Sequence, residues 1–376
     1  MNKIELGLSI CLLGTIIAGM KMTPAVQKLI PPQAYKIPKD VTVHHDTRID
    51  DYYWLKERDT QPVLDYLKAE NDYTFAKMKH TELLQKTLYN EMRGRIKEDD
   101  TTVPYKFGNY MYYTRTEENL QYDIYCRKLG NSSDNEEITL NMNEMAKKHD
   151  YIDLSAYKIS PNEKLLALTI DTSGAELHKL IVKDIKTGEI LDDHLSNLDG
   201  SVEWANDNKT LFYTVLDKAH RSYQLWRHEL GDEQSDDLLV LQEDDDRFSV
   251  GLHRTKSGEF LKMDLESQIT TEVYLLDRND PFGEWKLVQP REQGVEYYVY
   301  HHGNYLYQIT NKDAINFKMI RTTLKGGKED EIIPNRDKTT LDDVSMFKNY
   351  MAVLERIDGN LEIRLFNFED ESWYNI

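Results

Sequence analysis

A strand–turn–strand stretch, Val202-Glu203-Trp204, then Asn206-Asp207-Asn208-Lys209, then Leu211-Phe212-Tyr213-Thr214-Val215, decides the fold of this chain. The outer segments are rich in β-branched, aromatic and aliphatic residues, whereas the middle segment is polar. Asn and Asp in such a short polar segment favour a tight turn between two antiparallel strands. The stretch therefore predicts a β-hairpin over residues 202–215.

The same unit recurs along the chain, and an apolar anchor on the strand after each hairpin marks its register. The anchors are Ile124, Leu180, Leu225, Val273, Met319 and Ile363, at successive spacings of 56, 45, 48, 46 and 44 residues. Five residues further on, the fourth unit carries Arg278 and the others carry Leu129, Ile185, Leu230, Leu324 and Phe368. The other turns are Phe107-Gly108-Asn109, Ser160-Pro161-Asn162-Glu163, Lys256-Ser257-Gly258, His302-Gly303-Asn304 and Lys348-Asn349.

A period in the forties that is built from strands predicts the blades of a β-propeller, each an antiparallel sheet of four strands. An irregular all-β sandwich is the alternative, but it would not hold a near-constant spacing over five intervals. Six such units are found. We therefore predict a mostly β chain with a β-propeller of about six blades over residues 99–376, preceded by a short helical segment.

Composition and charge restrict the classes of partner. Of the 376 residues, 40% are hydrophobic and 30% are charged, which provides ample material for a core. The net charge of −19 disfavours nucleic acid and anionic membrane surfaces and favours cationic ligands. We expect the acidic runs to be solvated loops between strands. These runs are Glu98-Asp99-Asp100, Asp236-Asp237, Glu243-Asp244-Asp245-Asp246, Glu329-Asp330-Glu331 and Asp342-Asp343.

Cysteine and histidine give no metal-binding pattern. Cys11 and Cys126 are far apart in the sequence, and an internal disulfide is impossible if the first residues are removed. The pairs His44-His45 and His301-His302 lack a partner at metal-ligand spacing, so we expect them in loops or at strand ends. No metal and no cofactor is predicted. The 24 tyrosines, many of them in predicted strands, are expected to pack between sheets.

The first residues differ in character from the rest. Residues 6–20 carry no charge and lie between Lys3 and Lys21. That stretch is shorter than the roughly 20 residues of a membrane span and suits a signal-peptide core, so residues 1–22 are interpreted as signal-like. An uncleaved membrane anchor and a misassigned start are the alternatives. Export to the periplasm is favoured over a cytoplasmic location, and membrane contact is expected only through this segment.

A helical pattern occupies residues 31–98. Asp59 and Thr60 are placed to cap a helix that has Pro62 in its first turn, with Val63, Leu64 and Leu67 on one side. A second helix is expected to begin near Thr81, with Leu84, Leu88 and Met92 on one face. A propeller offers loop-rich faces that do not bury such stripes easily. These helices therefore need another partner.

Several segments of the helical arm and of the predicted blades match the pattern of one known family. In the helical arm they are Pro31-Pro32, His45-Asp46-Thr47-Arg48-Ile49-Asp50-Asp51-Tyr52-Tyr53-Trp54-Leu55, Val63-Leu64-Asp65-Tyr66-Leu67 and Glu70-Asn71. In the first blade they are Val103-Pro104-Tyr105, Tyr112-Tyr113-Thr114-Arg115-Thr116-Glu117 and Gln121-Tyr122-Asp123-Ile124-Tyr125-Cys126-Arg127. Later segments are Leu225-Trp226-Arg227-His228, Asp246-Arg247-Phe248-Ser249-Val250-Gly251 and Arg254-Thr255-Lys256-Ser257-Gly258. Together these segments resemble oligopeptidase B, in the prolyl oligopeptidase family of serine peptidases, and the resemblance covers residues 31–376.

The resemblance implies a two-part enzyme. In the family a seven-bladed propeller covers an α/β-hydrolase domain, and the N-terminal helical segment packs on that hydrolase. The six units found here therefore imply an incomplete β-propeller over residues 99–376. The hydrolase follows the propeller and supplies the Ser-Asp-His triad, while the propeller admits short peptides and excludes folded proteins. Oligopeptidase B relatives cleave after Lys or Arg, so short basic peptides are the implied substrates.

This sequence departs from that pattern at the catalytic centre. A nucleophile elbow needs Gly-x-Ser-x-Gly, and no such pentapeptide occurs. The nearest fragments, Gly7-Leu8-Ser9 and Thr172-Ser173-Gly174, lie in the leader and in a predicted blade turn. No catalytic, cofactor-binding or metal-binding residue is therefore assigned. Three functions stay open: the gating part of a peptidase whose hydrolase is a separate chain or lost, a propeller that binds proteins or peptides without catalysis, and a truncated gene product.

Overall fold

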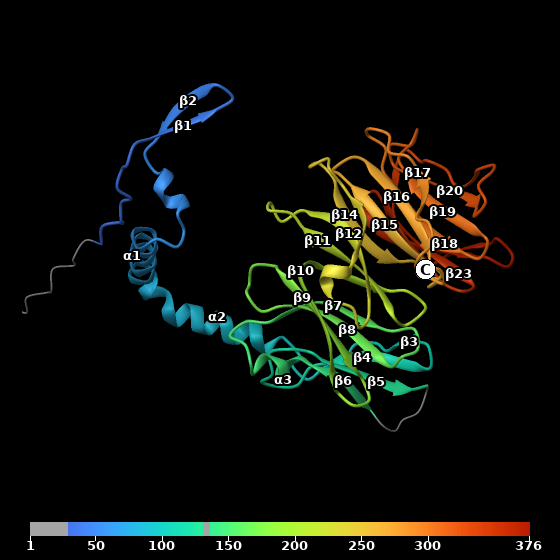
Figure 1. Ribbon diagram of the computed structural model, residues 1–376, viewed down its shortest axis with the longest axis horizontal. Helices are drawn as coiled ribbons and strands as arrows, with labels where there is room; N and C mark the ends of the chain where they lie inside the picture. The colour runs from blue at the N-terminus through green and yellow to red at the C-terminus, as the bar shows by residue number, and fades with distance from the viewer. Residues whose placement is uncertain (1–28, 131–135) are drawn as a thin grey trace, which may run out of the picture. The chain divides into compact units, whose positions relative to one another are not determined.

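The computed structural model describes residues 29–130 and 136–376 (Figure 1). Contacts divide the chain into two compact units, Met1–Lys97 and Glu98–Ile376. We call the described part of the first unit the arm and the second unit the propeller. Each is described by itself.

The arm contains a β-hairpin and two α-helices. Its elements are β1 (Lys39–Val43), β2 (Asp46–Asp50), the 3-10 helix η1 (Tyr53–Lys56), α1 (Gln61–Met78), the 3-10 helix η2 (Lys79–Thr81) and α2 (Glu82–Gly94). The hairpin turn is made by His44 and His45, both left-handed at φ of 52° and 65°. The sequence analysis missed this hairpin, although its placement of the pair in a loop is confirmed.

The two helices begin where the sequence predicted, but one cap differs. Thr60 precedes α1 and Pro62 lies in its first turn, as expected. The Thr60 hydroxyl does not cap the helix; it donates instead to the carbonyl of Glu57 at 2.8 Å. Val63 is buried, whereas Leu64 and Leu67 are 47% and 51% exposed. The predicted common apolar side of α1 is therefore only partly buried within the described residues.

Six blades follow in chain order within the described part of the propeller (Figure 1). Blade 1 has β3 (Tyr105–Phe107), β4 (Tyr110–Arg115), β5 (Ile124–Leu129) and β6 (Glu137–Asn141). Blade 2 has β7 (Asp153–Ile159), β8 (Leu165–Asp171), β9 (His178–Asp184) and the first half of β10 (Ile190–Trp204). Blade 3 has the second half of β10, β11 (Thr210–Leu216), β12 (Ser222–Glu229) and β13 (Leu238–Gln242). The short helix α3 (Met142–Ala146) follows blade 1, and the 3-10 helix η3 (Gln234–Asp236) precedes β13.

Blades 4 to 6 are separate four-stranded antiparallel sheets. Blade 4 has β14 (Ser249–Arg254), β15 (Phe260–Glu266), β16 (Thr271–Asp277) and β17 (Lys286–Gln289). Blade 5 has β18 (Tyr297–His302), β19 (Tyr305–Thr310), β20 (Lys318–Thr323) and β21 (Asp330–Ile333). Blade 6 has β22 (Thr339–Met346), β23 (Tyr350–Ile357), β24 (Asn360–Asn367) and β25 (Trp373–Asn375). The predicted propeller architecture is confirmed.

Blades 2 and 3 share one continuous strand. β10 pairs with β9 over its first half and with β11 over its second half, so the two blades form one seven-stranded sheet. The register shifts between Leu198 and Val202, where Gly200 has a φ of 110°. A β-carbon on Gly200 would lie 2.3 Å from the Ser155 hydroxyl oxygen, so both the backbone and the available space require glycine there.

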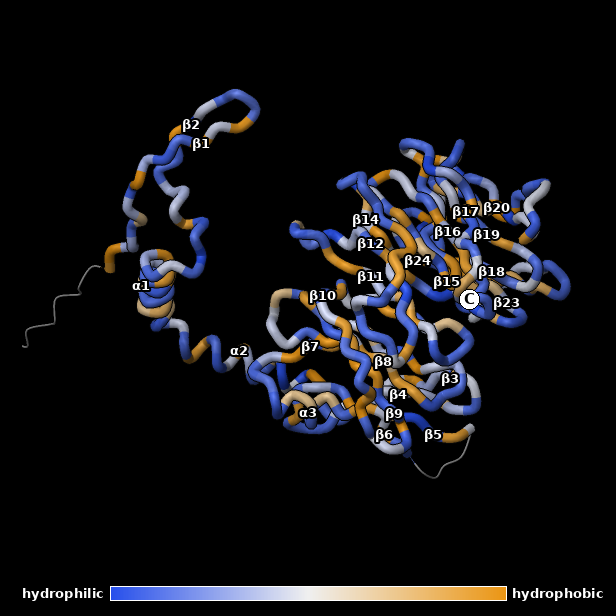
Figure 2. The backbone as a smooth tube through the Cα atoms, viewed as in Figure 1, coloured by the Kyte–Doolittle hydropathy of each residue, from blue (hydrophilic) through white to orange (hydrophobic). Residues whose placement is uncertain are grey.

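The anchors lie on the third strand of every blade, as predicted. Ile124, Leu180, Leu225, Val273 and Met319 are buried, while Ile363 on blade 6 is 44% exposed. Tyr112, Tyr213, Tyr297 and Tyr307 are among the largest fully buried side chains, which confirms the packing role expected for tyrosine. Figure 2 shows hydrophobic residues concentrated in the strands and hydrophilic residues in the connecting turns. The blades therefore cohere through apolar layers between neighbouring sheets.

Candidate functional site

The propeller has two faces that differ in the connections they carry. Because successive strands of each blade are antiparallel, the turns between first and second strands all lie on one side, which we call the turn face. The opposite side, which we call the loop face, carries the loops between second and third strands and the connections from one blade to the next. The chain therefore enters blade 1 and leaves blade 6 on the loop face.

On the turn face, side chains of the turns join neighbouring blades. Asn109 of blade 1 donates both its backbone N–H and its side-chain amide to Glu163 of blade 2, each at 2.8 Å. The backbone N–H of Asn162 donates to Asn208 Oδ1 of blade 3 at 2.6 Å. Asn206 of that turn donates to Asn279 Oδ1 of blade 4 at 2.9 Å. The predicted turn residues thus also hold neighbouring blades together.

Arg278, the exception in the apolar pattern, is buried at the junction of blades 3 and 4. Its Nε donates to the carbonyl of Trp204 at 3.0 Å, and its Nη1 donates to the carbonyl of Gly258 at 2.7 Å. Burial, and next the charge of Arg254, lower the pKa of Arg278 to about 10. A guanidinium at this position fixes the blade 4 turn against blade 3, which an aliphatic side chain cannot do.

Two adjacent histidines join blade 5 to the blades on either side. His301 Nε2 donates to the Gly303 carbonyl at 2.7 Å, so in its neutral form Nδ1 accepts the Ser257 hydroxyl of blade 4 at 2.8 Å. Burial lowers the pKa of His301, which favours that neutral form. His302 Nε2 donates to the Lys348 carbonyl of blade 6 at 2.9 Å, and its ring stacks on Phe368 at 3.7 Å. The prediction that this pair lies at a strand end is confirmed.

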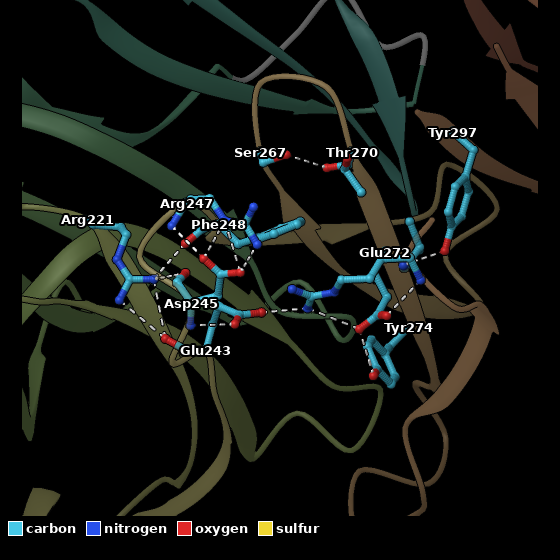
Figure 3. Close-up of polar contacts among 12 residues, drawn as sticks. Arg221, Glu243, Asp245, Arg247, Phe248, Ser267, Thr270, Glu272, Tyr274 and Tyr297 are labelled. Atoms are coloured by element: carbon cyan, nitrogen blue, oxygen red, sulfur yellow. Dashed lines mark hydrogen bonds and ion pairs between the residues drawn. The ribbon is translucent and has the colours of Figure 1, made fainter. Parts of the chain in front are cut away.

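A polar network joins blades 3, 4 and 5 on the loop face (Figure 3). Arg291 Nη2 lies 2.6 Å from Glu243 Oε2 and 3.2 Å from Glu272 Oε1, and its guanidinium lies 4.0 Å from the centre of the Phe248 ring. The Arg221 guanidinium donates to the carbonyls of Glu243, Asp245 and Phe248. The segment over residues 243–248 is therefore held at both its backbone and its side chains.

In this network the carboxylates of Glu243 and Glu272 both pair with the guanidinium of Arg291. Burial would raise the pKa of Glu272, but hydrogen bonds and charge from Arg291 lower it. Glu243 is 8% exposed and pairs with Arg291, so our expectation of a solvated loop is wrong for this residue. It is also wrong for Asp237, whose side chain is 1% exposed. In both cases the partner base lies in another segment of the chain, where the sequence pattern gives no signal.

Two further buried clusters pair acid with base, one between blades 2 and 3 and one inside blade 6. His228 lies between Asp237, 2.7 Å from Nδ1, and Asp193, 3.2 Å from Nε2. Burial alone would lower the pKa of His228, but the two carboxylates raise it. Glu355 in blade 6 is fully buried, contacts Arg336 and accepts from Arg364 at 2.6 and 2.8 Å. These groups are enclosed, so their role is structural.

No catalytic residue was assigned from the sequence. Of the two fragments that most resemble a nucleophile motif, one lies in a blade turn and the other lies outside the described residues. Ser173 lies in the turn between β8 and β9, where its hydroxyl donates to Asp171 at 2.7 Å. Gly7-Leu8-Ser9 and the signal-like segment lie outside the described residues. Over residues 29–130 and 136–376, no cluster of three His, Cys, Asp or Glu residues is arranged to hold a metal. In the same part of the chain, no helix combines the length and the apolarity that crossing a bilayer needs.

Comparison with known proteins identifies relatives of this architecture. Residues 32–376 match the family described as the prolyl oligopeptidase N-terminal β-propeller domain. The sequence is 32% identical over 340 residues to protease 2 of Moraxella lacunata, covering 88% of this chain and 49% of that protein. It is 31% identical over 392 residues to dipeptidyl aminopeptidase BI of Pseudoxanthomonas mexicana, covering 97% of this chain and 54% of that protein.

Solved structures give the same result. Oligopeptidase B from Leishmania major superposes with a TM-score of 0.85 at 28% identity, covering 92% of this chain and 52% of that chain. Oligopeptidase B from Trypanosoma brucei, with covalently bound antipain in a closed form, superposes with a TM-score of 0.83 at 29% identity, over the same shares of the two chains. The chain thus spans about half the length of the relatives it matches, and the matched half is the propeller.

Proposed function

Because the chain belongs to the prolyl oligopeptidase family through its N-terminal β-propeller domain, we propose that it is the gating part of an oligopeptidase B-like serine peptidase. In this proposal it acts with an α/β-hydrolase domain that lies outside residues 1–376. The hydrolase supplies the Ser-Asp-His triad and cleaves short peptides after Lys or Arg. The observation that carries the proposal is the family match over residues 32–376.

The apolar surface of α2 supports a hydrolase partner. Leu84, Leu88 and Met92 recur every four residues along the helix and are 57%, 46% and 61% exposed. Contiguous exposed apolar surface of this kind marks an interaction site. A free-standing interaction module would not need this stripe. We therefore favour a propeller that belongs with a hydrolase over one that binds proteins on its own.

The charge of the chain supports basic peptides as substrates. A net charge of −19 attracts cationic peptides by long-range steering. We propose that the chain alone has no measurable peptidase activity, because the matched family domain is the propeller and no nucleophile motif is present. Losing the triad alone leaves roughly 10³ to 10⁴ of the rate enhancement in serine proteases that keep their oxyanion hole, and we assign no such hole to this chain.

The test is to mix the full chain with a separately produced α/β-hydrolase domain of an oligopeptidase B. We expect a complex in analytical ultracentrifugation, and cleavage of an Arg-Arg reporter peptide only in the mixture. The double variant Leu84→Asp and Leu88→Asp should abolish the complex. Lys86→Asp, on the polar side of α2, is the matched control and should retain it.

Two results would overturn the proposal. One is cleavage of the reporter by the chain alone that a serine-directed reagent blocks. The other is equal binding of the hydrolase domain by wild type and by the Leu84 and Leu88 double variant.

A further inference from the structure

The turn face carries two contacts between blades that are not neighbours. Arg254, at the end of β14 in blade 4, places its guanidinium 5.2 Å from the centre of the Phe107 ring in blade 1. Lys256, in the following turn, places its ammonium 3.7 Å from the centre of the Phe347 ring in blade 6. Both distances lie within the range of a cation–π interaction.

These contacts span the propeller axis. Blade 4 contacts blade 3 through β10, β11 and β12, and blade 5 through β18, so blades 1 and 6 are not its neighbours. Because blades succeed one another around a central axis, a side chain of blade 4 that reaches blade 1 must cross that axis. Residues 254–258, which we call the bridging turn, therefore lie across the turn-face end of the axis.

The base of the bridging turn is fixed, whereas its two cations are held weakly. The carbonyl of Gly258 accepts from Arg278, and the Ser257 hydroxyl contacts His301. Phe347 is 50% exposed, so its contact with Lys256 is open to water. The Arg278 guanidinium also repels Arg254, since the charge of Arg254 helps to lower the pKa of Arg278. Arg254 and Lys256 are thus placed to leave their rings while the turn stays attached.

We propose that Phe107 and Phe347 form a binding site for the Lys or Arg side chains of a peptide, and that Arg254 and Lys256 close this site until a peptide displaces them. The faces of the two rings attract the Lys and Arg cations of a peptide by the same interaction that holds Arg254 and Lys256, because each cation interacts with the quadrupole of the ring. Arg254 and Lys256 therefore compete with the Lys or Arg side chains of a peptide for the same two ring faces. The turn-face end of the axis then admits basic peptides selectively.

The choice of basic peptides rests on the proposed function, but the test needs no hydrolase. It measures fluorescence polarisation of a labelled Gly-Arg-Arg-Gly peptide with the full chain, and of a matched peptide in which citrulline replaces each arginine. Two exposed cation–π contacts correspond to about a five- to thirty-fold preference for the closed arrangement. We expect the double variant Arg254→Ala and Lys256→Ala to bind the arginine peptide tighter by that factor. Binding of the citrulline peptide should not change.

A matched variant distinguishes two causes of tighter peptide binding: the uncovering of the Phe107 and Phe347 rings, and the mere loss of two positive charges. Lys209→Ala with Lys348→Ala removes two positive charges from other turns of the same face. The ammonium group of neither lysine lies over a ring among the described residues, so we expect less than a twofold change. Adding Phe107→Leu and Phe347→Leu to the Arg254 and Lys256 double variant should remove the gain. Unchanged urea midpoints will show that each variant is folded.

Three results would overturn the inference. They are an equal gain in the Lys209 and Lys348 variant, a gain for the citrulline peptide, and a gain that persists without the two rings. Failure of the hydrolase to bind the chain would contradict the proposed function while leaving this measurement unaffected.

Discussion

Replacing His228 with leucine removes the cation from the buried cluster between blades 2 and 3. Leucine fills a similar volume but has no N–H donor, so Asp193 and Asp237 stay buried, with side chains 4% and 1% exposed. Two hydrogen bonds, of 2.7 and 3.2 Å, are lost. Removing one member of a buried ion pair costs about 3 to 5 kcal/mol, and we expect the free energy of unfolding to fall by that amount.

Urea denaturation at pH 6, followed by tryptophan fluorescence, measures this loss. His253→Asn is the matched control, because the His253 side chain is 61% exposed and lies 3.7 Å from Asp264. We expect the control to lose less than about 1 kcal/mol. Equal unfolding free energies for the His228→Leu and His253→Asn variants would refute the reasoning.

The pH dependence gives a second readout of the same cluster. The folded protein raises the pKa of His228, so it keeps a proton at pH values where the unfolded chain has lost it. The stabilisation is complete below the ordinary imidazole pKa of about 6.5, and it is lost as the pH rises through the folded pKa. The difference in stability between wild type and His228→Leu should therefore shrink above pH 6.5. A difference that grows with pH would contradict this assignment.

Three further predictions concern other buried or exposed groups. Arg364 and Arg336 lower the pKa of Glu355 against the effect of burial, so its stabilisation is present above the ordinary carboxyl pKa of about 4.3 and is lost as the pH falls through the folded value. Glu355→Gln should lower the unfolding free energy by about 3 kcal/mol at pH 7 and flatten the acid limb of an unfolding curve; an unchanged acid limb would argue against this pairing. Burial raises the pKa of Cys126 to about 11, so at pH 8 we expect iodoacetamide to modify this thiol only after the chain unfolds. Peptide mapping measures the modification, and rapid labelling of the folded chain would contradict the burial of Cys126. Leu361 and Ile363 lie on one face of β24 and are 54% and 44% exposed, so we expect the chain to be marginally stable and to self-associate. Changing both residues to lysine should lower the molar mass measured by light scattering. A monodisperse wild-type monomer with a sharp thermal transition would contradict this expectation.

The repeat made the blades predictable, because an apolar anchor on each third strand is a local, periodic signal. Five of the six anchors are buried between sheets, and every quoted turn connects the first two strands of a blade. The start of α2 followed in the same way from Thr81 and the four-residue spacing of Leu84, Leu88 and Met92. These features depend on neighbours within a few residues in the sequence.

The contacts that join blades were not predictable, because their partners are distant in the sequence. Glu243 and Arg291 are 48 residues apart, and nothing in the acidic run shows that one of its carboxylates is buried. Arg278 broke the apolar pattern without revealing that its guanidinium reaches Trp204 and Gly258. The β1–β2 hairpin was missed for another reason, since His44 and His45 adopt left-handed backbone angles without the glycine or asparagine that usually signals them.

The continuous strand β10 determines which neighbouring blades of the propeller can separate. Separating blades 2 and 3 requires breaking the backbone hydrogen bonds of β10 with either β9 or β11. Blades 4, 5 and 6 are separate sheets, and no strand is shared between them. If neighbouring blades separate to let a peptide pass between them, we expect the separation between blades 4 and 5 or between blades 5 and 6. Blades 2 and 3 should then move as one rigid body.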